Sequence, residues 1–283
     1  MKLSIITINY NNLEGLKKTY DSVVCQTWTD YEWIIIDGGS TDGSREFIEE
    51  HQDKFAYWCS EPDKGVYNAM NKGIAKAHGE YLNFMNSGDC FYEENTLEYI
   101  FLTDYVEDII IGDAYWMQNG VEKKFCDASS GVYDMFFFLS SSVPHQAMFF
   151  RVECFERYGL YDENLKIVSD YKYSIDAIYF HKAATKYIPI KVCKYEGRGI
   201  SDNTSEMFIE RNEVIDGFFP LRIREDMQHL NNYKLTHDLV VSNSFTRWIY
   251  WMLPKIARRT LWMKERLKHI SSLFFAGKSV SCL

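Results

Sequence analysis

The stretch 63–89 reads DKGVYNAMNKGIAKAHGEYLNFMNSGD, and it carries the signals that decide the fold of this chain. Apolar residues recur at every fourth position, with a strip of small residues beside them, which predicts a helix over 65–77 that lies flat against a sheet. Gly79 is expected to stop this helix. The mostly apolar run 81–85 then predicts a strand that is buried on both faces of a parallel sheet.

The polar turn after this strand is a candidate ligand site. In open α/β sheets, ligands bind beyond the carboxyl ends of the strands. Asp89 offers a lone carboxylate after Gly88, where the backbone can approach a ligand closely, and this combination suits a metal ion and a phosphate. Asp63 and Gly65 stand at the predicted helix N-terminus, which favours anions, although Asp63 could equally only cap the helix.

The residues before this stretch alternate between predicted strands and helices. Strands are expected at 2–9, 32–37 and 55–59, with helices at 13–26 and 44–52 between them. This alternation predicts an α/β fold with a mixed, mainly parallel sheet flanked by helices. Right-handed crossovers would then bring the ends of the first, second and fourth strands to one edge of the sheet.

That edge is expected to carry the polar side chains of Thr7, Asn9, Asp37 and Asp89. Taken alone, Asp37 and the two glycines after it could equally form a plain turn. Together with the stretch 63–89 at the same edge, they favour a binding site.

These features resemble the nucleotide-sugar glycosyltransferases of family 2, which have the GT-A (Rossmann-like) fold, and the resemblance extends over about 3–201. The chain is similar in particular to enzymes that build bacterial capsule and exopolysaccharide, including the colanic-acid type. The resemblance implies that Asp37 reads the nucleobase, since a carboxylate can accept the N–H of uracil. It implies that Asp89 holds Mn²⁺ or Mg²⁺ on the donor's diphosphate. The expected donor-binding residues are Thr7, Asn9, Asp37, Asp63, Gly65, Asn86 and Arg198.

Two positions depart from the family pattern. Gly88 stands where many relatives have a second acidic residue, but one carboxylate suffices in principle, because Mg²⁺ or Mn²⁺ keeps several waters and can take further ligands from the diphosphate. Arg198 replaces a glycine in the loop that closes on the donor in the family. Arg198 could reach a phosphate or could equally be a solvated surface residue.

The catalytic residues are expected further along the chain. The stretch 161–171, YDENLKIVSDY, matches the family segment whose aspartate is the catalytic base, so the resemblance assigns that role to Asp170. A helix N-terminus keeps such a carboxylate ionised and able to accept a proton. Capping by Ser169 or Asp170 is the alternative. His145, in a His-Gln pair before an apolar strand, is expected in the cleft near the donor sugar or acceptor, or else as a structural hydrogen-bonding residue.

The segments around these residues are predicted more coarsely. A helix is expected over 95–106, and a hairpin turn at 119–120, where Asn-Gly separates two apolar runs. The Ser-rich and aromatic stretch 127–142 is predicted to be a loop on the acceptor side. The GT-A domain is expected to cover 1–220, and a C-terminal helical extension 221–283.

The net charge of −9 conceals a basic C-terminal end. Residues 245–283 contain eight Lys and Arg but one Glu, while the rest of the chain is acidic, which argues against nucleic acid as a partner. Within 245–275, apolar residues at helical spacing alternate with basic ones and Trp, which favours an amphipathic helix in the membrane surface; packing on protein is the alternative. The scattered cysteines indicate reduced thiols, so we expect a cytoplasmic protein attached peripherally to the inner face of the cell membrane.

The sequence therefore predicts an inverting glycosyltransferase that moves a hexose or N-acetylhexosamine from a nucleotide sugar, with UDP favoured, to a saccharide or lipid-linked oligosaccharide in surface polysaccharide synthesis. The Q-x-x-R-W motif of processive relatives does not occur, so a single transfer per acceptor is expected. The alternative is a sugar-nucleotide-binding scaffold without transferase activity, which rests on the glycine at position 88.

Overall fold

The computed structural model describes residues 1–118, 121–195 and 204–223, together with 225–226, 229–230, 232–233 and 252. The chain divides into two compact units, Met1–Phe218 and Phe219–Leu283, of which the first contains every element discussed below. Arg198 and the segment 245–275, except Met252, lie outside the described residues. The predicted boundary between a GT-A domain over 1–220 and a C-terminal helical extension over 221–283 stays a prediction.

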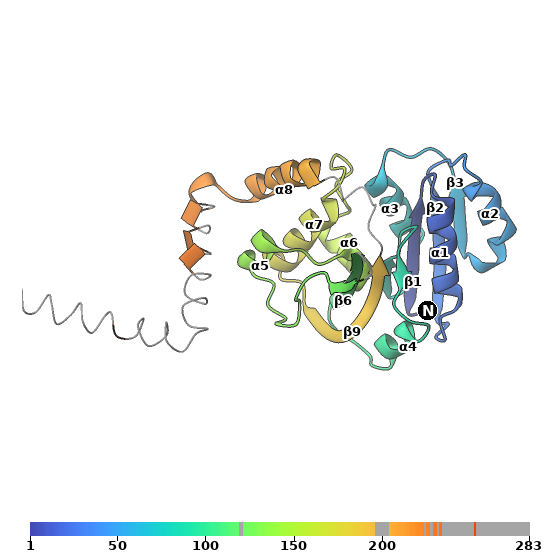
Figure 1. Cartoon of the computed structure of the whole chain (residues 1–283), viewed down its shortest axis with the longest axis horizontal. Helices are drawn as coiled ribbons and strands as arrows, with labels where there is room; N and C mark the ends of the chain where they lie inside the picture. The colour runs from blue at the N-terminus through green and yellow to red at the C-terminus, as the bar shows by residue number, and fades with distance from the viewer. Residues whose placement is uncertain are drawn as a thin grey trace, which may run out of the picture. The chain divides into compact units, whose positions relative to one another are not determined.

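The N-terminal part of the first unit forms a parallel sheet in the order β3-β2-β1-β4 with helices packed on it (Figure 1). The predicted alternation of strands and helices is confirmed. Its elements are β1 (Leu3–Asn9), α1 (Leu13–Val24), β2 (Tyr31–Asp37), α2 (Ser44–Glu50), a 3₁₀ turn (Gln52–Lys54), β3 (Tyr57–Ser60), α3 (Val66–Ile74) and β4 (Tyr81–Phe84).

The sheet continues from β4 through β8, β6 and β9 to β5, and β7 pairs with the outer part of β6. Strand β8 lies between β4 and β6 and is antiparallel to both, whereas β6 and β9 are parallel, so the sheet as a whole is mixed, as predicted. The elements are β5 (Cys90–Phe91), α4 (Thr96–Phe101), β6 (Ile109–Gln118), β7 (Val121–Lys124), α5 (Met135–Ser140), a 3₁₀ turn (His145–Ala147), β8 (Met148–Arg151), α6 (Val152–Tyr158), α7 (Ser169–Ser174), its π-helical continuation (Ile175–Phe180), β9 (Thr185–Tyr195) and α8 (Thr204–Phe218).

The central strands are buried on both faces, as the apolar runs predict. Ile5 of β1, Ile34 of β2 and Phe84 of β4 are inaccessible to solvent, and so is Phe149 of β8. Close packing of these side chains holds the strands in a fixed relation, so the positions where the strands end are rigid.

The helix α3 ends earlier than the sequence predicts, at Ile74 instead of Ala77. The chain tightens there, because Ala77 N bonds to the carbonyl of Ile74, three residues back. Gly79 does not stop the helix. It lies against β1, where a Cβ atom would come within 2.5 Å of the Ser4 backbone nitrogen, so a glycine is needed for this close approach.

Two other helices also differ from expectation. The helix predicted over 95–106 ends at Phe101, after which Tyr105 folds back and its buried hydroxyl donates to the carbonyl of Ile100 at 2.9 Å. The predicted loop 127–142 contains the helix α5. The Asp134 side chain caps α5 by accepting from Phe137 N at 2.9 Å, a start signal that the aromatic composition of this stretch obscured.

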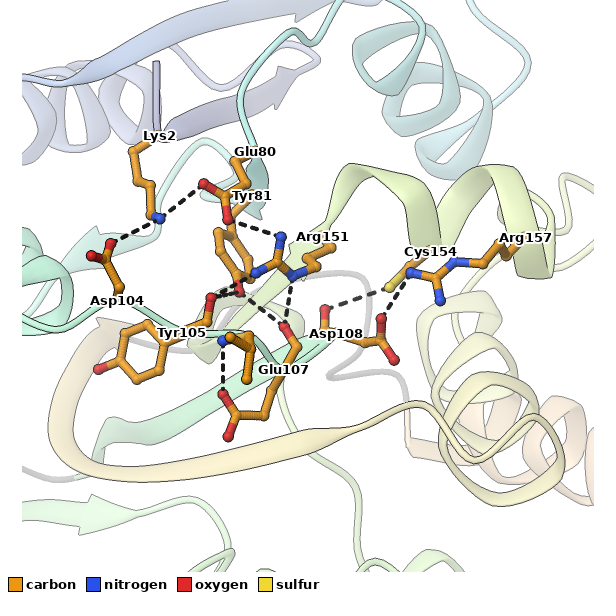
Figure 2. Close-up of polar contacts among 11 residues, drawn as sticks. Lys2, Glu80, Tyr81, Asp104, Tyr105, Glu107, Asp108, Arg151, Cys154 and Arg157 are labelled. Carbon is orange, nitrogen blue, oxygen red and sulfur yellow. Dashed lines mark hydrogen bonds and ion pairs between the residues drawn. The ribbon is translucent and has the colours of Figure 1, made fainter.

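A polar network fixes the edge of the sheet where β1, β4 and β6 begin (Figure 2). Arg151, the last residue of β8, pairs with Glu80 at 2.8 Å, and Glu80 also pairs with Lys2 at 2.8 Å. The same guanidinium donates to the carbonyls of Tyr105 and Glu107, at 2.6 and 3.1 Å. Because this edge is occupied by structural contacts, the opposite edge, where β1, β2 and β4 end, is the one open to a ligand.

Among the residues that the structure describes, no helix is both long enough and apolar enough to span a membrane.

Candidate active site

The carboxylate of Asp37 is entirely buried at the end of β2. One oxygen accepts from Asn9 Nδ2 at 2.8 Å and from Ser40 Oγ at 2.5 Å, and the other accepts from Ser40 N at 2.9 Å and from Ser60 Oγ at 2.6 Å. Both oxygens are therefore fully used in holding the turn after β2. In this structure Asp37 fixes the turn, and the nucleobase role that the resemblance implies for it stays a prediction.

Asp63 is the partly exposed carboxylate at this end of the sheet. Its Oδ1 accepts from Gly65 N at 2.9 Å, and its Oδ2 lies where a Cβ atom on Gly38 would approach to 2.6 Å. Gly38 therefore leaves the space that Asp63 occupies. The glycine pair after Asp37 was the sequence signal for this arrangement.

Thr7 and Asn9 serve the fold rather than an exposed surface. Thr7 is inaccessible to solvent; its hydroxyl donates to the Met85 carbonyl at 2.7 Å and accepts from Trp33 Nε1 at 2.9 Å. Asn9 is 3% exposed and bonds to Asp37. Both residues use their polar atoms to hold the strand ends together. The exception is Oδ1 of Asn9, which is buried without a partner among the described residues.

The turn after β4 is braced by α1. Thr19 Oγ1 accepts from Gly88 N at 3.0 Å and lies 2.8 Å from the carbonyl of Asp89, while Asn12 Nδ2 donates to the carbonyl of Ser87 at 3.0 Å. Gly88 has a φ of +105°, a conformation that favours glycine strongly. This conformation is a physical reason for a glycine where many relatives have an acidic residue.

Asp89 is partly buried beside this turn, and Gln146 Nε2 donates to its Oδ2 at 3.0 Å. Burial raises the pKa of the Asp89 carboxyl, and the charge of His145 and the hydrogen bond from Gln146 offset this only in part. A cation bound at Asp89 would favour the ionised carboxylate and so lower its pKa. Within the described ranges no group of three or more His, Cys, Asp or Glu could hold a metal by itself.

Asn86, in the same turn, has a buried Oδ1 that lacks a hydrogen-bond partner among the residues described. Amide and carboxylate oxygens of one turn are ligands that hard cations accept. These two residues are therefore compatible with a divalent cation that takes its remaining ligands from elsewhere, and the metal role of Asp89 stays a prediction.

Asp170 and His145 form a hydrogen-bonded pair. His145 Nδ1 lies 2.8 Å from Asp170 Oδ2, so Nδ1 carries the proton that it donates, and Nε2 lies 3.1 Å from Asn86 Nδ2. The other oxygen of Asp170 accepts from Tyr171 N at 2.9 Å and lies 3.0 Å from the Tyr67 hydroxyl, whose single proton is shared with the Ile167 carbonyl at 2.6 Å. The side chains of His145 and Asp170 are 16% and 23% exposed, so both reach the surface of the site.

This contact shifts both residues toward their charged forms. Burial alone would raise the pKa of Asp170, but the hydrogen bond and charge of His145, with the bonds from Tyr67 and Tyr171, lower it. Burial alone would lower the pKa of His145, but the hydrogen bond and charge of Asp170, with the charge of Asp89, raise it. Asp170 is therefore ionised at neutral pH, as the sequence analysis required of a base.

The surroundings of Asp170 correct the capping alternative. The N-cap of α7 is Val168, and Ser169 uses its hydroxyl to accept from Asp162 N at 2.6 Å, so neither Ser169 nor Asp170 caps this helix. Two residues were missed. Tyr67 of α3 donates to the carbonyl of Ile167 at 2.6 Å as well as contacting Asp170, and Gln146 contacts Asp89. For Gln146, the signal in the sequence was its place directly after His145 in the His-Gln pair.

The sequence profile described as glycosyl transferase family 2 matches residues 4–121. An uncharacterised glycosyltransferase of Mycobacterium tuberculosis is 31% identical over 210 residues, which cover 71% of this chain and 77% of that protein. The chain belongs to glycosyl transferase family 2. The relative is mycobacterial, so the narrower resemblance to capsule and colanic-acid enzymes stays a prediction.

Solved structures of glycosyltransferases share the fold of this family 2 chain. TarS of S. aureus, in complex with UDP-GlcNAc, has a TM-score of 0.55 and 19% identity, over 70% of this chain and 59% of that chain. The mannosyltransferase PcManGT of Pyrobaculum calidifontis, in complex with GDP-Man and Mn²⁺, has a TM-score of 0.58 and 16% identity, over 99% of this chain and 88% of that chain. The predicted GT-A fold is thereby confirmed.

Proposed function

We propose that this family 2 glycosyltransferase is an inverting enzyme in which Asp170 is the base and Asp89 the metal-binding carboxylate. One observation carries the proposal: two consecutive residues bridge these carboxylates, since His145 bonds to Asp170 at 2.8 Å and Gln146 bonds to Asp89 at 3.0 Å. The pKa of Asp170 is lowered and that of Asp89 is raised, and such separated pairs mark distinct chemical roles.

The reaction is a single displacement. Asp170 accepts the proton of an acceptor hydroxyl while the hydroxyl oxygen forms a bond to the anomeric carbon. The bond from that carbon to the diphosphate oxygen breaks, and the nucleoside diphosphate leaves with the electron pair. Inversion requires the base and the leaving group on opposite sides of the sugar. In this proposal Asp170 and Asp89 serve those two sides, and each is held by one residue of the His145–Gln146 pair.

Asp89 would hold Mn²⁺ or Mg²⁺, which, when bound, neutralises charge on the departing diphosphate. The raised pKa of Asp89 and the unpartnered Oδ1 of Asn86 support this assignment. PcManGT was solved with Mn²⁺, which supports the choice of ion. Gln146 orients the carboxylate, and its N–H leaves one oxygen of Asp89 for the cation.

Asp63 takes the nucleobase role that the sequence analysis gave to Asp37, because Asp63 is the carboxylate with an accessible position there, above Gly38. Asp37 then acts indirectly, by fixing the turn. A uracil base suits the carboxylate, and TarS in complex with UDP-GlcNAc supports a UDP-sugar with a hexose or N-acetylhexosamine. Gly65, Asn86 and Arg198 complete the proposed donor site.

The acceptor is proposed to be a saccharide or a lipid-linked oligosaccharide of a surface polysaccharide, to which the enzyme adds one sugar. The basic, Trp-containing sequence 245–275 supports attachment to the inner face of the cytoplasmic membrane, because anionic lipid attracts such segments. Binding to anionic liposomes that weakens steeply with salt would support this placement, whereas salt-independent binding would contradict it.

A screen of nucleotide sugars tests the function. The protein is incubated with Mn²⁺ and UDP-Glc, UDP-GlcNAc or GDP-Man, and release of nucleoside diphosphate is measured, with a chelator as control. We expect metal-dependent release from a UDP-sugar by wild type and its loss in Asp89→Asn. If every donor binds but none is hydrolysed or transferred, the sugar-nucleotide-binding scaffold is the correct interpretation.

A further inference from the structure

One face of α8 packs on the part of the molecule that carries the proposed base. Val214 and Ile215 on this helix are each 7% exposed, whereas Phe208 and Ile209 are 54% and 61% exposed. The helix therefore has one inward face, although its sequence shows little separation of apolar and polar residues. Glu210 and Arg211 lie one turn before Val214 and Ile215 on that inward face, and both are partly buried. Figure 1 shows α8 running beside α7.

Glu210 binds the backbone that leads into the base helix. Its Oε1 accepts from Lys166 N at 2.6 Å, and its Oε2 accepts from Ile167 N at 2.7 Å and from Val168 N at 3.0 Å. Three successive N–H groups thus share one carboxylate. Hydrogen bonds to a charged group are shorter and stronger than neutral ones, so this segment is held firmly.

The opposite side of the same segment is held by Tyr67. Its hydroxyl lies 2.6 Å from the carbonyl of Ile167 and 3.0 Å from Asp170 Oδ1. The peptide that enters α7 is therefore fixed from both sides, by Glu210 through its N–H groups and by Tyr67 through a carbonyl. Asp170 lies two residues after Val168, so its position depends on where this peptide is held.

Arg211, the neighbour of Glu210, binds the segment that leads to His145. It donates to the carbonyls of Phe138 and Ser141, at 2.6 and 3.1 Å, at the C-terminal end of α5, where a cation is favourable. Its guanidinium also stacks over the ring of Tyr171 at 4.6 Å, and the Tyr171 hydroxyl donates to the same Phe138 carbonyl at 2.6 Å. Arg211 thus connects α5 to the residue that follows Asp170.

We propose that Glu210 and Arg211 are positioning residues, which set Asp170 in register with His145 by holding the two backbone segments that carry them. The catalytic importance of this register rests on the proposed function, but the register itself is a property of the ligand-free protein. Neither residue touches substrate; each acts through the segment that it binds. The consequence is that α8, far along the chain from the donor-binding strands, determines the geometry of the base.

The test compares Glu210→Gln with Glu213→Gln, because Glu213 is an exposed acid one turn along the same helix and its loss removes the same charge. Hydrogen exchange of the amides 166–168 reports the contact itself. An NMR titration of the His145 imidazole reports the contact with Asp170, which raises the pKa of His145. Calorimetry with UDP and Mn²⁺ reports the donor site, and thermal melting reports stability.

In Glu210→Gln we expect exchange at 166–168 to accelerate by at least roughly tenfold, because three hydrogen bonds to a charged group are weakened. The titration midpoint of His145 should fall, because its contact with Asp170 raises it in wild type. In Glu213→Gln both should match wild type, and binding of UDP with Mn²⁺ should be equal in all three proteins. Arg211→Lys, which keeps the charge but loses the planar group, should lower the His145 midpoint in the same direction.

The proposal is overturned if Glu210→Gln melts at a lower temperature while His145 titrates as in wild type, because Glu210 would then only stabilise the helix. Equal shifts in Glu213→Gln would also overturn it, since they would report charge rather than position. If Glu210→Gln does not fold, Glu210→Asp, which keeps the charge on a shorter side chain, must show the same displaced midpoint. Failure of the proposed function would instead appear as absence of transfer by wild type, with these readouts intact.

Discussion

Asp170→Asn removes the proposed base while keeping the size of the side chain. The Asn oxygen can still accept from Tyr67 and Tyr171 N, but its NH₂ group would face the Nδ1 proton of His145 at the 2.8 Å now spanned by the hydrogen bond. Two donors cannot share that position, so His145 must release its Nδ1 proton. The substitution therefore removes the proton acceptor and the ion pair together.

Transfer should fall by roughly 10²–10⁴-fold, the usual contribution of a positioned base. The free energy of unfolding should fall by about 1–2 kcal/mol, because a hydrogen bond between charged groups is lost while the cost of burying both charges is also relieved. Replacing a capping Asp by Asn would change stability little, because both residues cap helices about equally well. Asp170 does not cap α7 but is paired with His145, so a larger loss of stability is expected. Binding of UDP and Mn²⁺ should persist, since Asp63 and Asp89 are unchanged.

The stability effect should depend on pH in a defined direction. The pKa of Asp170 lies below 3.8, so its contribution is present above that value and is lost as the pH falls through its folded-state pKa. The pKa of His145 lies above 6.5, so its contribution is present below 6.5 and is lost as the pH rises through its folded-state pKa. The difference between wild type and variant should therefore be larger at about pH 5.5, below the unfolded-state pKa of His145, than at a pH above its raised folded-state pKa.

Urea unfolding at the two pH values measures the stability, and an NMR assay of the anomeric product measures transfer and its stereochemistry. Asp176→Asn is the matched control, because Asp176 forms an exposed pair with His181 at 3.7 Å. That control should change stability by less than about 1 kcal/mol. Near-normal transfer by Asp170→Asn, or a product that retains the donor's anomeric configuration, would refute the reasoning. Joint loss of transfer and of UDP binding would move Asp170 to the donor site.

Four further substitutions test the other polar groups. Asp89→Asn should abolish metal-dependent transfer and weaken UDP binding in Mn²⁺, measured by calorimetry; full activity would contradict the metal role. Asp63→Ala should weaken UDP binding by roughly tenfold with little change in turnover at saturating donor, whereas Asp37→Ala should lower the free energy of unfolding by about 2–4 kcal/mol, because it strands the donors that Asp37 satisfies. Arg151→Met should also cost about 2–4 kcal/mol in urea unfolding, because it leaves Glu80 and two carbonyls short of partners, and it should leave UDP affinity unchanged.

The alternation of strands and helices could be predicted because periodicity and burial are local properties of the sequence. The parallel direction of β1, β2 and β4 followed from this alternation, and the handedness of crossovers placed their ends at one edge of the sheet. The ends of α3 and α4 could not be predicted, since Gly79 packs against the distant backbone of β1 and Tyr105 folds its side chain back onto the C-terminal end of α4. Such boundaries depend on tertiary packing rather than on propensity.

The candidate site was predictable residue by residue but not contact by contact. His145 and Asp170 were each identified, yet their hydrogen bond joins positions 25 residues apart, and Tyr67 reaches Asp170 across 103 residues. The position of Asp37 at the end of a predicted strand indicated the edge of the sheet where the candidate site lies. It could not show that the Ser40 hydroxyl in the same turn and the Ser60 hydroxyl at the end of β3 both donate to this carboxylate. Glu210 has the sequence context of an ordinary surface charge.

His145 and Gln146, which contact Asp170 and Asp89, limit how the sequence of this enzyme can change in evolution. His145 and Gln146 belong to a 3₁₀ turn that runs directly into the buried strand β8, so the separation between the two carboxylate partners is set by one peptide unit anchored in the sheet. An insertion or deletion there would destroy the reaction geometry at once. Residues on the exposed face of α8 lie outside this constraint, so they can change by substitution while the reaction geometry is inherited unchanged.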